Sequence, residues 1–396
     1  RGCPNEKEAC GVPPGKHNGP MMRRAIAGLL LFGLGSLFAG AGNQDWQQPP
    51  ARVPANAPQL SRLLVDEHGR RIASKRGWRQ HRALLQAQWQ AVLGEFPAAK
   101  PPLRSQVLGT EELPEFTRQH VTYQVEEGVF TDGYLLTPRA AKGRFPAVVV
   151  FHPTTPLQAK GVAGLAAEYD REKWQGVQLV QRGYIVWCPR NYIETAGTNW
   201  AGNAARVRAR HPRWTGMTRM VWDAIRAADF VTSLPRVDRK RLGCLGHSLG
   251  GKEVLFAMAF EPRYRAGVSS EGGIGLKFSN WEAPWYFGRQ IQQPGFQREN
   301  HEVLALAAPR AFLLLAGDSA DDDRSWEFIQ AVRPVYELLG AARNLGWLNH
   351  HQGHRYAPEA RAAAEAFLDQ HLKPRPREHF DRAPPGGKGG GRSSGR

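Results

Sequence analysis

Cysteine is scarce in this chain, with four among 396 residues. Cys3 and Cys10 precede the first Met, whereas Cys188 and Cys244 end two apolar runs, where a Cys is most often a small buried hydrophobic residue. The sequence contains no Cys and His spacing that is typical of a zinc site. We expect Cys188 and Cys244 to be free thiols because their strands should not be neighbours, and the sequence implies no metal or organic cofactor.

Acidic residues are also in deficit, since 36 Asp and Glu stand against 53 Lys and Arg, giving a formal net charge of +17. Such an excess would suit nucleic acid if it were concentrated in a stripe. Here the Arg residues are scattered, part of the excess lies near the chain ends, and no RNA-binding strand motif is present. We predict no nucleic-acid partner, and a basic surface would instead favour an acidic polysaccharide.

A long uninterrupted apolar run is missing as well. Residues 25–34 are apolar but short and Gly-containing for a membrane span. They follow the basic Met-Met-Arg-Arg of residues 21–24 and precede Ala-Gly-Ala at 39–41, the order expected of a secretory signal peptide. We predict a signal peptide at 21–41 and a secreted or periplasmic protein without stable membrane insertion. The alternative is an uncleaved membrane anchor.

The rest of the chain divides by composition. Residues 1–20 precede the signal and are predicted to be a non-native upstream segment. Residues 42–74 are rich in Pro, Gln and Ala and predict a linker. Residues 374–396 are rich in Pro, Gly and basic residues and predict a disordered tail. Residues 75–373 then suit one large domain.

Within that domain, apolar patterns of strand and helix alternate. The expected strands are 120–125, 129–136, 147–151, 184–188, 241–245, 266–269, 311–315 and 344–348. The expected helices are 76–94, 162–181, 218–233, 250–260, 325–339 and 358–372. Alternation of this kind implies a mostly parallel sheet with right-handed crossovers. We predict eight strands with helices on both faces, the two leading strands forming an antiparallel edge.

Residues 246–250, Gly-His-Ser-Leu-Gly, lie between an expected strand and an expected helix. A Ser at such a tight turn is held in a strained conformation that projects its hydroxyl above the sheet. The motif in this context predicts an α/β-hydrolase fold with Ser248 as the nucleophile. An oxyanion would be stabilised by two backbone N–H groups, for which we choose Leu249 and Thr154, the latter in the loop after strand 147–151.

The base and the acid must come later in the chain, because this fold orders its triad as Ser, acid, His. His354 follows a Gly in the loop before the last helix, so it is the predicted base. His350 and His351 lie nearer the strand and are expected to pack or to support the site.

The acid has two candidate positions. Its usual place is the loop after strand 311–315, but the third residue after Gly317 is Ala320, with Asp318 and Asp321 close by. Glu271 follows the preceding strand, where a lone carboxylate between an apolar strand and a Gly pair needs a partner. We favour Glu271 and keep Asp318 and Asp321 as alternatives; these two would otherwise cap the next helix.

These residues resemble carbohydrate esterases of the α/β-hydrolase superfamily. Ser-Glu-Gly at 270–272 is similar to the acid position of glucuronoyl esterases, and Lys252, four residues after the Ser, matches a Lys that contacts the uronic acid in that family. The family has Arg directly after the nucleophile, where this chain has Leu249. The wider layout resembles acetyl xylan esterases and cephalosporin deacetylase-like hydrolases.

The resemblance implies an exported serine esterase that acts through an acyl-enzyme on acetyl or uronoyl esters of plant polysaccharide. A small-molecule or oligosaccharide ester is the expected partner, and Lys252, Trp281 and Trp285 are the expected substrate contacts, because aromatic faces suit sugar rings. Two alternatives remain: a peptidase of the prolyl oligopeptidase type, and a catalytically silent carbohydrate-binding homologue.

Overall fold

A single twisted sheet organises the chain. The computed structural model describes residues 46–139, 143–155, 157–166, 171–194 and 199–373. The strands are β1 (Gln106–Glu112), β2 (Phe116–Glu126), β3 (Val129–Pro138), β4 (Phe145–Phe151), β5 (Ile185–Pro189), β7 (Val237–His247), β8 (Tyr264–Ser270), β9 (Ala311–Ala316) and β10 (Leu345–Asn349). Their order across the sheet is β1-β2-β3-β5-β4-β7-β8-β9-β10.

The sheet is parallel from β5 to β10, whereas β1, β2 and β3 form an antiparallel extension that joins the edge of β5. This confirms the mostly parallel sheet and its antiparallel edge. The expected count of eight strands was one too low within the described part. The additional strand, β1, has all seven residues exposed, so it lacks the apolar alternation that identifies a strand in a sequence.

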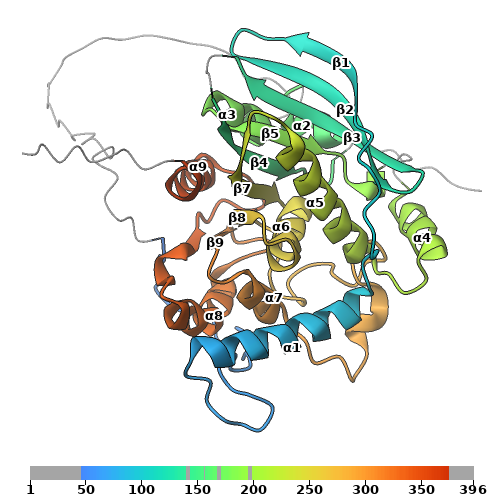
Figure 1. Ribbon diagram of the computed structural model, residues 1–396. Helices are drawn as coiled ribbons and strands as arrows, with labels where there is room; N and C mark the ends of the chain where they lie inside the picture. Colours follow the sequence, from blue (N-terminus) through green and yellow to red (C-terminus); the bar gives the residue numbers. More distant parts are fainter. Residues whose placement is uncertain (1–45, 140–142, 156, 167–170, 195–198, 374–396) are drawn as a thin grey trace, which may run out of the picture. The chain divides into compact units, whose positions relative to one another are not determined.

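Helices cover both faces of the sheet (Figure 1). Within the described residues they are α1 (Lys75–Leu93), α2 (Gln158–Val162), α3 (Gln175–Gln181), α4 (Trp200–Arg210), α5 (Gly216–Ser233), α6 (Leu249–Phe260), α7 (Asn300–Ala307), α8 (Trp326–Leu339) and α9 (Pro358–Leu372). Strand β4 shows why both faces are covered. Ala147, Val149 and Phe151 face one apolar cluster, and Val148 and Val150 face the other. Its continuous apolar run therefore follows from burial on two sides.

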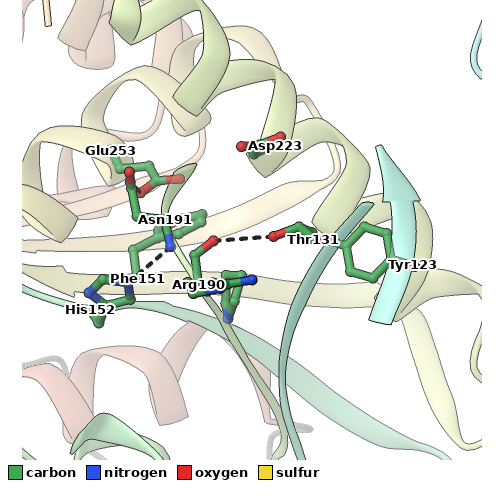
Figure 2. Close-up of a pocket in the computed structure, with 9 residues that line it drawn as sticks. Tyr123, Thr131, Phe151, His152, Arg190, Asn191, Asp223 and Glu253 are labelled. Carbon is green, nitrogen blue, oxygen red and sulfur yellow. Dashed lines mark hydrogen bonds between the residues drawn. The ribbon is translucent and has the colours of Figure 1, made fainter. Parts of the chain in front are cut away.

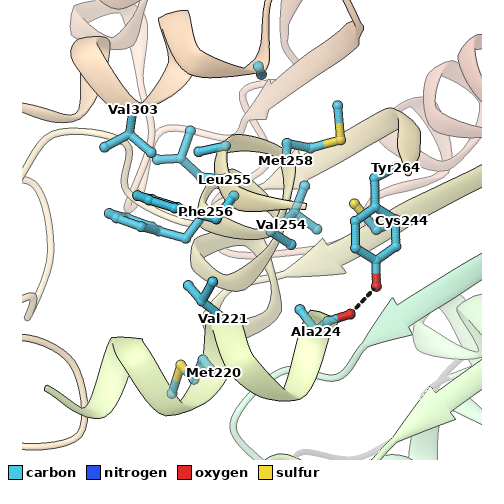
Figure 3. Packing of buried hydrophobic residues seen from close by; sticks show 14 of the residues in the cluster. Met220, Val221, Ala224, Cys244, Val254, Leu255, Phe256, Met258, Tyr264 and Val303 are labelled. Atoms are coloured by element: carbon cyan, nitrogen blue, oxygen red, sulfur yellow. Dashed lines mark hydrogen bonds between the residues drawn. The ribbon is translucent and has the colours of Figure 1, made fainter. Parts of the chain in front are cut away.

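Helix α6 lies at the centre of the molecule, with all twelve of its residues buried. It packs on α5, α7 and β8, and Figure 3 shows Phe256 and Val254 among these neighbours, with the Tyr264 hydroxyl donating to the Ala224 carbonyl. A helix that is apolar nearly all round is typical of such a central position. Because α6 begins directly after Ser248, the candidate nucleophile stands at the start of a fully buried helix.

Several segments differ from expectation. Helices α4 and α7 were not predicted, and the helix expected over 162–181 is formed only by the shorter α2 and α3, on either side of residues 167–170, which are not described. The described part of the expected linker, 46–74, packs against the domain: Trp46 joins one apolar cluster, and Leu63 and Ile72 join the other. These scattered apolar residues carry no helical or strand period, which is why composition alone indicated a linker.

Residues 1–20, the signal segment 21–41 and the tail 374–396 lie outside the described residues. Cys188 and Cys244 are buried free thiols, as expected. Across the described ranges, no helix has the length and apolarity to cross a membrane.

Candidate active site

Ser248 occupies a sharp turn between β7 and α6. Its backbone has φ 58° and ψ −117°, a strained region for a residue with a side chain. The glycines on either side make the turn sterically feasible. A Cβ at Gly246 would lie 2.3 Å from the Gly250 carbonyl, and one at Gly250 would lie 2.0 Å from the Phe151 carbonyl oxygen. The strand and the helix approach so closely only because those two positions lack side chains, and the turn presents the Ser hydroxyl above the sheet.

Three side chains from separate loops form a continuous hydrogen-bonded series. His354 Nε2 lies 2.9 Å from Ser248 Oγ, and His354 Nδ1 lies 3.0 Å from Glu271 Oε2. His354 comes from the loop between β10 and α9, and Glu271 directly follows β8. The imidazole side chain is 43% exposed, so substrate can reach it, whereas Glu271 is completely buried. A hydroxyl, an imidazole and a carboxylate in this order can generate a nucleophile.

The loop after β9 contacts Glu271 but does not supply the carboxylate that faces His354. The N–H of Ala320, the third residue after Gly317, donates to Glu271 Oε2 at 2.8 Å. Asp318 is exposed and is engaged by Asn349 and His351. The buried Asp321 accepts hydrogen bonds from backbone N–H groups and a hydroxyl, none of them His354. Of the three carboxylates considered from sequence, only Glu271 meets the imidazole.

Asp321 instead binds the backbone of the turn after Glu271. Its two oxygens accept from the N–H groups of Gly273 and Ile274 at 2.7 and 2.8 Å. Burial raises the pKa of Asp321 to about 6. The Trp281 indole donates to the Gly273 carbonyl at 2.7 Å from the other side. Backbone groups of this turn are therefore fixed by side chains that approach from two directions.

The loop after β4, in which Thr154 was chosen as an oxyanion donor, rests on a buried polar network. His152 Nε2 accepts the Asn191 N–H, so the proton is on Nδ1, which donates to the Pro153 carbonyl. Burial lowers the pKa of His152 to about 4, which keeps the ring neutral. The Asn191 amide donates to Glu253 on α6, and Figure 2 shows these three side chains together beside a small cavity. Thr154 itself is exposed.

The model of the prolyl oligopeptidase family matches residues 172–374, which contain all three residues of the hydrogen-bonded series. The chain belongs to the prolyl oligopeptidase family. Its sheet and helices are those of the α/β-hydrolase fold, as the motif around Ser248 predicted.

Relatives of this family member include carbohydrate esterases. A 4-O-methyl-glucuronoyl methylesterase of Sodiomyces alcalophilus is 26% identical over 166 residues, covering 33% of this chain and 32% of the relative. The chain thus aligns with about a third of that relative's length.

Among solved structures, a glucuronoyl esterase from Solibacter usitatus matches with a TM-score of 0.66 at 19% identity, covering 81% of this chain and 99% of that one. A promiscuous esterase of carbohydrate esterase family 15, from a marine bacterial metagenome, matches with a TM-score of 0.61 at 18% identity, covering 81% and 98%. These likenesses establish the fold.

Two of the expected substrate contacts turn inward in this family member. Trp281 is 1% exposed and packs against Phe256 and Phe287, so it is a core residue. Lys252 is 3% exposed, with acceptors inside the protein. The two side chains are buried for one reason, which is that the loop after Glu271 folds back over α6. Trp285 is half-buried and contacts Trp200 edge to face.

His247, which precedes the nucleophile, was not singled out from sequence. It is 2% exposed, its Nδ1 lies 3.1 Å from Ser270 Oγ, and its ring centroid is 4.9 Å from that of His354. Burial holds the pKa of His247 well below its usual range, so the ring stays neutral beside His354. The only sequence signal was its place as the variable residue of the motif, which carries no chemical indication.

One group of side chains within the described ranges has the geometry for a metal ion. Ligand atoms of Asp318, Asp323 and His351 lie within 4.8 Å of one another. The Asn349 amide donates to both carboxylates, and His351 Nδ1 lies 2.8 Å from Asp318 Oδ2. These hydrogen bonds explain why the three side chains lie close together at the protein surface.

Proposed function

We propose that this protein is a serine esterase, and the observation that carries the proposal is the series Ser248–His354–Glu271. Ser248 attacks the ester carbonyl while His354 takes its proton, and Glu271 orients the imidazole and stabilises its positive charge. The alcohol leaves with a proton from His354. Water, activated by the same imidazole, then hydrolyses the acyl-enzyme.

The negative charge that develops on the carbonyl oxygen needs hydrogen-bond donors to stabilise it. We assign this role to the N–H groups of Leu249 and Thr154. Leu249 is the first residue of α6, whose N-terminus adds partial positive charge at the same point. The buried network behind His152 would hold the Thr154 loop in place before substrate arrives.

The proposed substrates are carbohydrate esters, carrying acetyl or uronoyl groups of plant polysaccharide. Support comes from the glucuronoyl esterases among the relatives and from the basic net charge of +17, which would attract acidic polysaccharide. A surface cavity of about 640 Å³ lies in the segment after Glu271, with Ser279, Glu282 and Phe296 in its wall. It offers polar and apolar contacts of the kind an oligosaccharide uses.

The test is hydrolysis by purified wild-type protein and by Ser248→Ala of three substrates: nitrophenyl acetate, acetylated xylan and a glucuronate methyl ester. Wild type should cleave at least one of them, and Ser248→Ala should lose about 10³-fold or more in kcat. A fluorophosphonate probe should label the wild type but not the variant. A Ser248→Ala protein with wild-type turnover would refute the assignment, and a wild type that neither turns over nor labels would favour a silent carbohydrate-binding protein.

The family match favours peptide hydrolysis as a second candidate, because the same series of side chains also serves amide cleavage. A proline-containing peptide nitroanilide separates the two activities. Amide turnover comparable to ester turnover would establish a peptidase, whereas hydrolysis of esters alone would support the esterase proposal.

We also propose that the protein is exported, on the basis of the basic, apolar and Ala-Gly-Ala segments of residues 21–41. The N-terminal sequence of the protein recovered outside the cytoplasm should begin at Gly42. Recovery only from the cytoplasm, with residues 21–41 intact, would exclude this.

A further inference from the structure

Helix α6 carries a charge in its buried interior. Lys252 lies one turn after Ser248 and is only 3% exposed. A cation in such a position is costly unless it is paired with strong acceptors. The presence of Lys252 in the core therefore has to be explained by the groups that its ammonium group contacts.

The ammonium group bridges α6 to the loop that follows the acid. Lys252 Nζ donates to the carbonyl of Gly272 and, at 2.8 Å, to Ser279 Oγ. It also lies over two aromatic rings, 4.9 Å from the centroid of Trp281 and 5.4 Å from that of Tyr286. The rings stabilise the positive charge where water is excluded.

The hydrogen bond from Lys252 to Gly272 matters because of where Gly272 lies. Gly272 is the residue after Glu271, whose backbone has a positive φ of 50°. The Glu271 N–H is held by the Leu315 carbonyl, and Asp321 holds the N–H groups beyond Gly272. Lys252 donates a charged hydrogen bond to the Gly272 carbonyl, which lies between the Glu271 N–H and the N–H groups that Asp321 holds. Without it, the Gly272 carbonyl would be buried without its charged donor, and the peptide that directly follows Glu271 would lose its tie to α6.

We propose that Lys252 is a positioning residue for the triad: its ammonium group ties the turn after Glu271 to the nucleophile helix and thereby sets the Glu271 carboxylate against His354. The proposal rests on the esterase function proposed above. It makes Lys252 one of the side chains that align the acid.

The charges around Lys252 predict a pH signature. Burial lowers the pKa of Lys252 to about 8, against the opposing pull of Asp321, Glu271 and Glu282. The phenol of Tyr286, which also faces the ammonium group, has its pKa raised by burial and stays neutral. As the pH rises through about 8, Lys252 loses its proton and the charged hydrogen bond to Gly272 weakens. The wild-type kcat should therefore fall on the alkaline side.

The experiment compares wild type, Lys252→Met and Lys252→Arg on nitrophenyl acetate, a substrate too small to need a sugar subsite, from pH 6 to 10. Lys252→Met should lower kcat by about 10- to 100-fold with little change in KM, because a misplaced acid affects turnover rather than binding. It should also lack the alkaline fall. Lys252→Arg should recover part of the activity and move the fall to higher pH, because guanidinium stays charged.

Lys240→Met is the matched control, since Lys240 is exposed near the start of β7, the end of the strand remote from Ser248, and it should behave as wild type. Thermal unfolding of each variant checks the fold. If Lys252→Met is unfolded, the comparison of wild type with Lys252→Arg decides by the position of the alkaline fall.

A Lys252→Met enzyme with kcat within twofold of wild type, or an alkaline fall at the same pH in Lys252→Arg as in wild type, would overturn the positioning role. Either result leaves the esterase proposal standing. A wild type that is inactive on esters and unlabelled by fluorophosphonate would instead refute the proposed function.

Discussion

At the scale of single residues, the candidate site is defined by which carboxylate faces the imidazole. Glu271 reaches His354 from the end of β8, and the loop where the acid is usual contributes the Ala320 N–H to the same carboxylate. Asp321, one residue along, binds the turn that carries Glu271. The carboxylate that faces His354 therefore follows β8, and the loop after β9 contributes a backbone donor to it.

Glu271→Gln is expected to lower kcat for ester hydrolysis by about 10²- to 10⁴-fold, because the amide cannot stabilise the imidazolium that forms when His354 takes a proton. Steady-state kinetics with nitrophenyl acetate measure the effect.

Asp318→Asn is the matched control for this change. Asp318 is exposed and contacts Asn349 and His351 rather than His354, so its variant should keep kcat within about twofold. If Asp318→Asn lost activity and Glu271→Gln did not, the acid would lie in the loop after β9.

At the scale of elements, the turn from β7 to α6 depends on close backbone contact. The Gly250 position faces the Phe151 carbonyl at the end of β4, so the nucleophile helix lies directly against the neighbouring strand. Every residue of α6 is buried, so the helix cannot shift away from β4 without disturbing the close packing around it.

Gly250→Ala should therefore destabilise the protein by about 3 kcal/mol or more, because its Cβ would lie 2.0 Å from a backbone oxygen that cannot move without displacing β4. Urea unfolding followed by fluorescence measures the change.

Gly109→Ala on β1 supplies the comparison, since a Cβ there would meet nothing within 4 Å. It should change the free energy of unfolding by less than about 0.5 kcal/mol. Equal stability of the two variants would mean that the turn is looser than the structure has it.

At the scale of the whole molecule, buried ionisable groups make stability depend on pH. His301 on α7 is 2% exposed and binds Ser61, in the segment expected to be a linker, and burial lowers its pKa from 6.5 to about 4. The unfolded chain binds a proton at pH 6.5 that the folded protein accepts only near pH 4. This histidine therefore contributes a loss of stability as the pH falls from 6.5 to 4.

His301→Gln should remove that loss. Between pH 7 and 4.5, urea unfolding should show wild type losing about 2 to 3 kcal/mol more than the variant. Buried acids with a raised pKa, such as Asp321, act in the opposite direction over this range, and the difference between the two proteins cancels them. His68→Gln, at an exposed position, should follow wild type. Parallel curves for wild type and His301→Gln would show that His301 is not neutral in the folded state.

Sequence by itself determined the features that are local in the chain. The apolar run of β4 and the Gly-His-Ser-Leu-Gly turn predicted the parallel sheet, the fold and Ser248 as the candidate nucleophile, because strand burial and a tight turn restrict residue type at fixed spacing. The position of His354 before the last helix followed from chain order. The free thiols followed from strand order.

Tertiary structure decided what depends on contacts between distant segments. It decided between Glu271, which the sequence favoured, and Asp321 as the carboxylate that faces His354. It also showed that Trp281 and Lys252 are buried, because the path of the loop after β8 has no period in the sequence. It likewise packed Trp46 onto α9 through Phe367, and paired β1 by backbone hydrogen bonds. Such contacts are fixed by the shape of the surrounding core, which no short stretch of residues encodes.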